Sequence, residues 1–473
     1  MRSIIKKIQL IVIVAIIALA VYCIAGEQLK YTIVEQPIQN VETILPELEK
    51  GTVIEQKFRS KVDVIQSFVL QPFSFGRVNQ GIIDFFILDD ANNVIASTSA
   101  RSEDCVDYMP YTMVFADGVR VNKGKEYTLR IVLNESEGLN PTFYYTTNSQ
   151  AFRDDIGSFK VNDSWITGTL CLGISGIKIE FIGTYYWYIV AIITIALLIY
   201  QKWCEYRTRQ GKFTIITLIC AIWKRYHFLI EQLVSRDFKV KYKRSVLGYC
   251  WSFLNPLLTM MVQYFVFSTV FRFDIENFPV YLLAGNIIFS FFTESVAQGL
   301  MSIVGNSSLI TKVYVPKYIY PVTKVMSTAI NLFISIIPLL LVVLITGERI
   351  NFTILLLPYA LMCLLIFCLG IVLALSAINV FFRDVQYLWN IVSLIWMYAT
   401  PIFYPADIIP ENLRFIQTVN PIYQIITFIR TILMDGVSPS PQVYLNCLIG
   451  AVISLFIGTF IFKKTQNKFA LYI

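Results

Sequence analysis

The sequence predicts an α-helical polytopic membrane protein of about eight transmembrane helices, with an all-β sandwich domain inserted near the N-terminus. The first observation is composition: 56% of the 473 residues are hydrophobic and 15% are charged, whereas about a quarter of a soluble protein is charged. The second is the length of uncharged runs such as Phe352–Phe382 and Val385–Ala406, which match or exceed the ~20 residues that a helix needs to cross a bilayer. The third is a polar segment, residues 26–182, in which short apolar runs alternate with turn residues.

Residues 1–25 are predicted to form an N-terminal membrane anchor. A basic stretch precedes the apolar run Ile8–Ala25. Signal peptides share this arrangement, and Cys23-Ile24-Ala25 is an acceptable cleavage site. The length of the apolar run favours an uncleaved anchor. Both interpretations send the following segment outward, so the choice stays open without changing the topology.

Residues 26–182 are predicted to form an extracellular or periplasmic β sandwich, because strand-like runs are separated by turn signals. The predicted strands are Val62–Leu70, Gly81–Leu88, Val94–Thr98, Met113–Phe115, Tyr127–Leu133, Thr142–Tyr145 and Thr169–Phe181. The predicted turns are Asp89–Asn93, Asn122–Gly124 and Glu137–Pro141. Whether Cys105 and Cys171 form a disulfide stays open, because the sequence does not give their separation.

Residues 183–203 are predicted to return through the membrane, with the aromatic run Tyr185–Tyr188 at the interface. The next segment, residues 204–246, is the most basic in the chain, which predicts a cytoplasmic location. Within it, apolar residues at steps of three and four predict an amphipathic helix in the inner membrane interface. These residues are Tyr226, Ile230, Leu233, Val234, Phe238 and Tyr242. An ordinary juxtamembrane charge cluster is the alternative.

Residues 247–473 contain six further predicted spans. They lie near Leu247–Phe271, Pro279–Val304, Val322–Ile345, Ile354–Phe381, Tyr387–Tyr404 and Val443–Phe462. Lysine and arginine gather in alternate loops and in the C-terminal tail, and acidic residues gather in the others. This alternation predicts a multi-pass protein of the plasma or inner membrane with both termini in the cytoplasm.

The sequence predicts no catalytic site, metal or cofactor in this chain. Neither Gly124-Lys125 nor Gly211-Lys212 continues into a phosphate-binding loop, and His227 is the single histidine. The carboxylate pairs Asp89-Asp90 and Asp154-Asp155 sit beside turn-like sequence, so we expect solvated turn residues. Nucleic acid is not an expected partner, because the basic residues border membrane spans.

Several motifs in the core resemble those of type-2 ABC exporter permeases, in particular the branch that exports O-antigen, teichoic acid and other capsule-like polysaccharides. They are Ser235–Trp251 (SRDFKVKYKRSVLGYCW) with Asn255-Pro256, Asn306–Lys317 (NSSLITKVYVPK), Phe382–Val385 (FRDV), Thr400–Pro405 (TPIFYP), Asn420-Pro421 and Arg430. Their order and spacing also resemble the family pattern. The chain departs from it at the front, where a span, the β domain and a second span precede the amphipathic segment.

The resemblance implies a homodimer that encloses one path and works with two copies of a separate ATPase, which binds ATP and Mg. It also implies that Asn306–Lys317 is the segment that docks on the ATPase. The residues expected to carry this coupling are Leu309, Ile310, Lys312, Val313, Tyr314 and Pro316. Apolar side chains would form one face of a short helix, and the proline would end it. A tight helix–helix turn is the alternative.

The implied substrate is a glycan on a lipid pyrophosphate carrier. Its anionic headgroup would meet cations at the inner interface, namely Arg236, Lys239, Lys241, Lys243 and Arg244. The alternative for each cation is binding anionic lipid and fixing topology. Sugar rings pack on aromatic faces, and the candidates for lining the path are Trp251, Tyr264, Phe265, Phe267, Trp396, Tyr398, Phe403 and Tyr404. We expect fewer than half of these to do so.

Two charged residues stand out in the core. Glu294 lies inside a predicted span, where charge is costly and usually faces protein or water. Arg430 lies in Asn420–Asp435, which we expect to form partly re-entrant outer helices that cap the path. An ion pair between Glu294 and Arg430 is conceivable, but no spacing argument joins them.

Two other functions compete with polysaccharide export. One is an ABC exporter of drugs or simple lipids, which a narrow path poor in aromatic residues would favour. The other is a membrane-anchored glycan-sensing or assembly module with the β domain as sensor. The stretch Gly124–Ile131 resembles the late strand of jelly-roll carbohydrate-binding modules, which makes glycan contact by the β domain an expectation. The long hydrophobic core argues against a simple anchored sensor.

Overall fold

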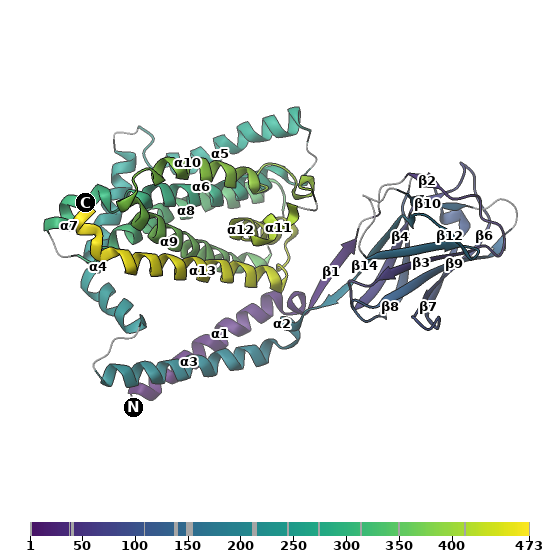
Figure 1. Cartoon of the computed structure of the whole chain (residues 1–473), viewed down its shortest axis with the longest axis horizontal. Coiled ribbons are helices and arrows are strands. Elements are labelled where there is room, and N and C mark those ends of the chain that lie inside the picture. Colours follow the sequence, from purple (N-terminus) through teal and green to yellow (C-terminus); the bar gives the residue numbers. More distant parts are fainter. Residues whose placement is uncertain are drawn as a thin grey trace. The chain divides into compact units, whose positions relative to one another are not determined.

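The computed structural model describes residues 2–36, 38, 42–107, 109–136, 141–147, 155–210, 215–243, 246–272, 275–312, 315–348, 351–410 and 413–472. The chain forms two compact units (Figure 1). The β unit comprises Lys30–Tyr185, and the helical unit comprises Met1–Leu29 and Tyr186–Ile473. The β unit therefore begins four residues later than predicted, because helix α1 continues to Lys30, and ends later because the short helix α2 (Phe181–Thr184) belongs to it.

Seven helical segments in the described part of the chain are long and apolar enough to cross a membrane, not eight. They are Lys7–Lys30, Tyr186–Arg207, Cys250–Val270, Phe278–Leu300, Ile319–Ile345, Phe352–Phe381 and Pro441–Lys468. The predicted span Tyr387–Tyr404 is the one that fails. Its helix, α10 (Val385–Ala399), has 15 residues and is about 22 Å long, short of a ~30 Å hydrocarbon core. It ends because Thr400 precedes a proline and adopts an extended conformation.

The first two spans form a helical pair. Helix α1 (Arg2–Lys30) lies against α3 (Tyr186–Arg209), where the Tyr186 hydroxyl donates to the Ala18 carbonyl at 2.7 Å. The helix runs through the candidate cleavage site without a break, and Ala25 and Leu29 are buried in the core of the helical unit.

The core of the helical unit is built on α6 (Phe278–Leu300), α8 (Ile319–Ile345), α9 (Leu357–Phe381) and α13 (Pro441–Thr465). Helices α9 and α13 run beside one another (Figure 1). A side-chain carbon added at Gly458 would overlap the carbonyl oxygen of Gly370, and one added at Gly370 would overlap Ser454. Small residues four positions apart thus bring the two backbones into direct contact, as is common between membrane helices.

The two ends of the bundle differ in charge. One end gathers residues around the C-terminal ends of α9 and α13, where Val380, Phe462 and Phe469 share a buried cluster. The basic residues near this end are Lys317, Lys324, Arg383, Lys463, Lys464 and Lys468. The opposite end carries the acidic residues Glu276, Glu348 and Asp435 and the basic residues Arg272 and Arg414. Burial, and then the charges of the two glutamates, raise the pKa of Asp435. We call these the basic end and the acidic end.

The β unit is a sandwich of antiparallel sheets, as the sequence predicts. The six-stranded sheet has the order β12 (Ser164–Ile166), β11 (Ile156–Val161), β3 (Val53–Arg59), β9 (Glu126–Ser136), β6 (Gly81–Leu88) and β7 (Val94–Arg101). A four-stranded sheet has the order β1 (Tyr31–Gln36), β14 (Leu172–Ile179), β4 (Val64–Leu70) and β8 (Tyr111–Arg120). Shorter strands are β13 (Thr169–Leu170), β10 (Thr142–Thr146), β2 (Thr43–Ile44) and β5 (Pro72–Phe73). Phe58 of β3 meets Phe68 of β4 between the sheets, with 5.3 Å between ring centroids.

The predicted strands are present, although Thr169–Phe181 is divided into β13 and β14 and its last residue belongs to α2. Strands β1, β3, β11 and β12 and the two-residue strands β2 and β5 were not predicted. In β3 the fully buried Gln56 interrupts the apolar alternation of Ile54 and Phe58. Its side chain is satisfied by remote partners: the amide donates to the Gly157 carbonyl at 2.9 Å, and its oxygen accepts from Leu170 N–H at 2.8 Å.

The two predicted turn carboxylates differ. Asp89 caps an exposed turn as predicted, and hydrogen bonds from Asn93, and then from the Ala91 amide, hold its pKa below the usual range. The prediction for Asp155 is wrong, because this residue is 2% exposed and pairs with Lys61 at 2.8 Å. Asp154 and most of the predicted turn Glu137–Pro141 lie outside the described residues.

The structure shows Cys105 and Cys171 as buried thiols that are not joined to each other by a disulfide. Burial raises the pKa of each to about 12. The thiolate, which is the form that reacts, is therefore scarce at neutral pH. Both cysteines serve as small apolar residues of the β unit.

We expect Gly458→Ala to destabilise the helical unit, because the new methyl group overlaps the Gly370 carbonyl. Overpacking of this kind costs about 2 kcal/mol, measured as the shift in the unfolding midpoint on titration from mild detergent into SDS. The matched control is Gly305→Ala, where the added carbon meets nothing within 4 Å. Equal midpoints for the two variants would contradict the close approach of α9 and α13.

We expect the stability of the β unit to fall in acid through Glu55. Burial alone would raise the pKa of Glu55, but hydrogen bonds from Lys160 and Arg130 outweigh it and lower the pKa. The stabilisation is therefore present at neutral pH and is lost as the pH falls from the unfolded value of 4.5 through the lowered one. The measurement is hydrogen exchange of the β3 amides, corrected for intrinsic rates. Their protection should fall in acid in the parent protein and not in Glu55→Gln. Glu126→Gln, which removes a long and exposed pair with Lys57, should behave as the parent does.

Candidate functional site

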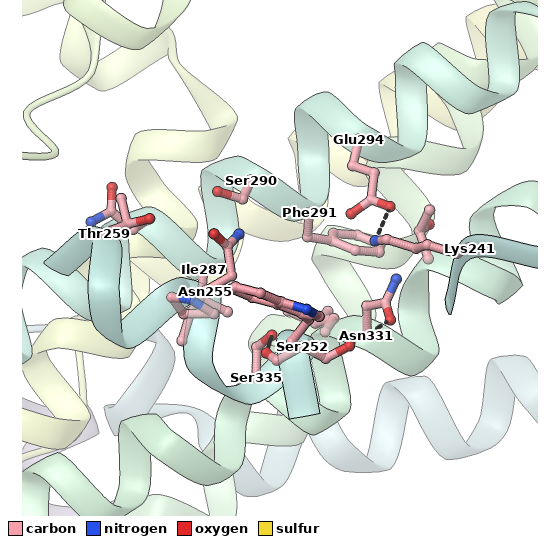
Figure 2. A pocket seen from close by; sticks show the side chains of 15 residues that line it. Lys241, Ser252, Asn255, Thr259, Ile287, Ser290, Phe291, Glu294, Asn331 and Ser335 are labelled. Atoms are coloured by element: carbon pink, nitrogen blue, oxygen red, sulfur yellow. Dashed lines mark hydrogen bonds and ion pairs between the residues drawn. The ribbon is translucent and has the colours of Figure 1, made fainter. Parts of the chain in front are cut away.

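A polar cavity of about 310 Å³ lies between α5 (Cys250–Phe265), α6 and α8 (Figure 2). Its polar and charged lining residues are Lys241, Ser252, Asn255, Thr259, Asn286, Ser290, Glu294, Thr328, Asn331 and Ser335. Trp251, Pro256, Ile287, Phe291 and Leu332 complete the wall. Polar side chains within membrane spans are costly unless they face protein or water, so this lining marks a hydrated or hydroxyl-bearing space.

The cavity is polar because each of its three helices carries a stripe of polar residues at steps of three and four. Such spacing places residues on one helix face. The stripes are Ser252, Asn255 and Thr259 on α5, Asn286, Ser290 and Glu294 on α6, and Thr328, Asn331 and Ser335 on α8. The spacing is visible in the sequence, and it is the signal from which this cavity could have been predicted.

Hydrogen bonds between the stripes hold the cavity wall together. The Ser252 hydroxyl donates to the Asn331 side-chain oxygen at 3.1 Å, and the Ser335 hydroxyl donates to the Ser252 carbonyl at 3.0 Å. Asn286 donates to the side-chain oxygen of Gln263 on α5. These bonds join α5 to α6 and α8, so the polar groups orient the helices as well as lining the space.

An ion pair stands at the end of the cavity nearest the basic end. Lys241 is in the last turn of α4 (Ile215–Tyr242), and its Nζ lies 2.5 Å from Oε1 of Glu294. Gln298 Nε2 donates to the same oxygen at 2.8 Å. Figure 2 shows Lys241 and Glu294 pointing toward one another. Glu294 is thus paired with the amphipathic helix, and the ion pair with Arg430 that we considered does not form.

Arg430 binds backbone instead. Its guanidinium donates to the carbonyls of Pro401 at 2.8 Å, Ile402 at 3.0 Å and Tyr281 at 3.0 Å. The residue is 8% exposed, and Gly285 leaves room for it, since a side-chain carbon there would lie 2.9 Å from the guanidinium. Arg430 therefore ties the end of α12 (Pro421–Arg430) to α6 and to the chain after α10.

The neighbouring motif residues converge on the same place. Asn420 caps α12 by accepting from the Ile422 amide at 3.1 Å, and it also accepts from the Trp396 indole at 2.9 Å. Its amide donates to the Thr400 hydroxyl at 2.8 Å. Helix α12 has ten residues and is about 15 Å long, which is too short by itself to cross a bilayer. That this helix caps the outer end of the path stays a prediction.

The predicted amphipathic helix is α4. Ile230 and Leu233 are buried against Ile319 at the start of α8, with Val315 and Tyr318 beside them. Near the other end of α4, Phe238 stacks on Tyr249, with 5.0 Å between ring centroids and 7° between planes. The side chain of Tyr242 lies outside the described part. The apolar face of α4 thus contacts the helix that follows the predicted coupling segment and the residue before α5.

The predicted coupling segment contains a short helix, α7 (Ser307–Lys312). Leu309 is 39% exposed, whereas Ile310 packs on the buried cluster at the basic end. Lys317 donates to the Gln466 carbonyl at 2.7 Å, which joins the segment to the C-terminal residues. Pro316 lies in the connection to α8. Val313, Tyr314 and the side chain of Lys312 are outside the described residues.

The structure brings one of the described interface cations, Lys241, to the cavity. Arg236 pairs with Asp237 at 3.0 Å, and Asp237 also lies 2.7 Å from Lys324 of α8. Lys239 and Lys243 are exposed, and Arg244 lies outside the described residues.

The aromatic residues that were predicted to line the path lie in several different parts of the helical unit. Trp251 lines the polar cavity. Tyr398, Phe403 and Tyr404 line a second cavity of about 670 Å³ with Phe267, which stacks on Phe403 at 5.3 Å. Trp396 packs on Phe292 at 5.0 Å. Tyr264 and Phe265 of α5 are exposed on the bundle surface.

The described part of the chain is thus a bundle of apolar helices, long enough to span a membrane, around a polar cavity. Residues 229–434 match the model of the ABC-2 type transporter family. The chain belongs to this family of ABC-2 type exporter permeases. The β unit lies outside the matched residues.

Proteins similar to this chain are named for O-antigen export or polysialic acid transport. The chain is 33% identical to the O-antigen export system permease protein RfbA of Klebsiella pneumoniae over 244 residues, which are 51% of this chain and 93% of that protein. It is 32% identical to the protein of the same name from Myxococcus xanthus over 249 residues, 52% of this chain and 95% of that protein. It is 26% identical to the polysialic acid transport protein KpsM of Escherichia coli over 248 residues, 50% of this chain and 93% of that protein.

We expect Arg430→Met to loosen the outer cap, because three buried carbonyls lose their donor. Leaving buried polar groups unsatisfied costs about 3 kcal/mol here, measured as the fall in the SDS unfolding midpoint. Arg383→Met is the matched control, because Arg383 is exposed. An unchanged midpoint for Arg430→Met would contradict a stabilising role for the clamp.

Proposed function

We propose that this chain is the permease subunit of an ATP-driven exporter that moves a lipid-linked polysaccharide from the cytoplasm to the cell surface. The observation that carries the proposal is the polar cavity inside the membrane spans of a chain whose relatives are named for O-antigen and polysialic acid transport. Serine, threonine and asparagine both donate and accept hydrogen bonds. They therefore suit the hydroxyl groups of a sugar chain that must pass through a bilayer.

The proposed topology puts the basic end in the cytoplasm and the acidic end outside. The charge difference between the two ends supports it through the positive-inside rule. The spans Lys7–Lys30 and Tyr186–Arg207 flank the β unit. With α4 in the cytoplasm, the β unit then lies on the extracellular or periplasmic face, and both termini lie inside.

The energy comes from a separate ATPase, which binds ATP and Mg. Helix α7 supports this assignment, because it is short, lies at the basic end and exposes Leu309. Its attachment through Ile310 and Lys317 would pass a displacement to α9, α13 and the C-terminal segment. A rigid docking element of this kind is the simplest way to transmit work from another polypeptide.

Two copies of the chain, with two ATPase subunits, would enclose one path. Helices α5 and α10 (Val385–Ala399) supply apolar surface for this purpose, since Leu258, Met261, Leu388 and Ile391 are exposed. Lipid tails compete for the same surface, so the proposal of a homodimer rests on the family assignment.

Export of a simple lipid or drug is the second candidate. The aliphatic part of the second cavity, formed by Ile408, Leu413 and Ile416, favours it, whereas the aromatic residues of the same wall favour a glycan. The two functions differ in cargo. An added lipid-linked glycan should compete with the cargo for transport if the chain exports glycans, and it should have no effect if the chain exports a simple lipid or drug. Transport by proteoliposomes of the purified complex distinguishes them.

We expect Leu309→Asp to abolish export by the complex, because a charge on the exposed face of α7 would weaken docking of the ATPase. The measurements are co-purification of the ATPase from native membranes and cell-surface glycan in the same cells. Leu471→Asp is the matched control, since Leu471 is an 82% exposed leucine of the C-terminal segment. Normal export by Leu309→Asp, or purified chain that transports glycan without an ATPase, would overturn the proposal.

A further inference from the structure

The Lys241–Glu294 pair occupies a position that the export function does not by itself explain. Among the residues of α6 that line the cavity, Glu294 is the one nearest the C-terminal end of the helix, six residues before Leu300. This places it about 9 Å inside the end of the span. Lys241 reaches it from α4, a helix outside the three that form the cavity wall. The pair therefore lies across the cytoplasmic approach to the cavity.

Glu294 keeps a partner when the lysine is removed. Its Oε1 accepts from Gln298 at 2.8 Å as well as from Lys241 at 2.5 Å. A carboxylate in a membrane span is costly when it has no donor, and Gln298, on the same helix, supplies one. The side chains of Lys241 and Glu294 are 37% and 32% exposed, so water and an anion can reach the ammonium group.

Helix α4 also has a second attachment. Asp237 lies four residues before Lys241, on the same face of the helix, and pairs with Lys324 of α8 at 2.7 Å. Arg236 is the other charged group on Asp237, at 3.0 Å. Release of Lys241 would therefore leave α4 held on α8 through Asp237, Ile230 and Leu233, and on Tyr249 through the ring of Phe238.

We propose that the Lys241–Glu294 pair is a latch at the cytoplasmic end of the cavity, opened when the diphosphate headgroup of a lipid carrier replaces Glu294 on the Lys241 ammonium. The inference rests on the proposed export function and names the group that admits the cargo. Phosphate oxygens accept charge-assisted hydrogen bonds from an ammonium as carboxylates do. A neutral lipid offers no such exchange. The latch therefore admits carriers with an anionic headgroup and excludes neutral ones before the sugar reaches the polar stripes.

The test measures access to the cavity and does not depend on transport. A Ser335→Cys variant of the full chain in nanodiscs is treated with a water-soluble maleimide, and labelling of that position is followed by mass spectrometry. Ser335 lines the cavity and is buried while the ion pair is formed. It lies two turns beyond Thr328 of α8, whose hydroxyl is hydrogen-bonded to Ser295 next to Glu294. We expect slow labelling when no lipid is added. A polyprenyl diphosphate should make labelling about fivefold faster, because this factor corresponds to the free energy of a partly exposed ion pair. The uncharged polyprenol should have no effect.

Variants separate a latch from a purely structural pair. Glu294→Gln should label fast without any lipid, and the exchange Lys241→Glu with Glu294→Lys should restore slow labelling. Lys241→Arg should behave as the parent does, and so should Lys224→Met, which changes an exposed lysine farther along α4. Equal labelling of parent and Glu294→Gln would overturn the latch. An equal response to free pyrophosphate would overturn the assignment to a lipid carrier.

The latch and the export function fail in different ways. Diphosphate-dependent labelling without glycan transport would leave the latch standing and refute export. Glycan transport with labelling that ignores the diphosphate would refute the latch and leave export standing.

Discussion

Polar groups inside a bilayer must bind one another or face water, and most of the helical unit follows from this constraint. Three helices each carry a polar stripe, and the stripes converge on one cavity because any other orientation would turn them toward lipid. Hydrogen bonds between Ser252, Asn331 and Ser335 then fix how the helices meet. Arg430 satisfies the same requirement at the outer cap, where it supplies donors to carbonyls that a proline-interrupted chain leaves without helical partners.

The basic end adds a mechanical connection to this polar core. Helix α7 is attached to the ends of α9 and α13, and the residues that follow it pack on α4. Helix α4 in turn contacts α8 through Asp237, α6 through Lys241 and the start of α5 through Phe238. A displacement at α7 therefore has a short path of direct contacts to the helices that line the cavity. The β unit has no counterpart in the family match, and its antiparallel sheets form a core of their own.

The relation between sequence and structure differs among the elements. Apolar runs located the membrane helices within a few residues, and Arg430 and Asn420-Pro421 were recognised as landmarks before their contacts were known. The span Tyr387–Tyr404 failed because its apolar character continues through Thr400-Pro401, whereas its helix does not. Strand β3 was missed because Gln56 looks like a surface residue until Gly157 and Leu170 are seen to satisfy it. Asp155 was misread for the same reason, since its partner Lys61 is 94 residues away.

The sequence by itself determined what depends on local composition: which segments are long and apolar enough to enter the membrane, which loops carry positive charge, and where a soluble β unit interrupts the helices. Tertiary structure alone decided the partners of the polar residues. Glu294 and Lys241 are 53 residues apart, and Arg430 binds carbonyls 28 to 149 residues away. Hydrophobic burial acts on every residue independently, so it can be predicted from a continuous apolar segment of sequence. A hydrogen bond needs two specific groups, and only the packing of the helices brings those groups together.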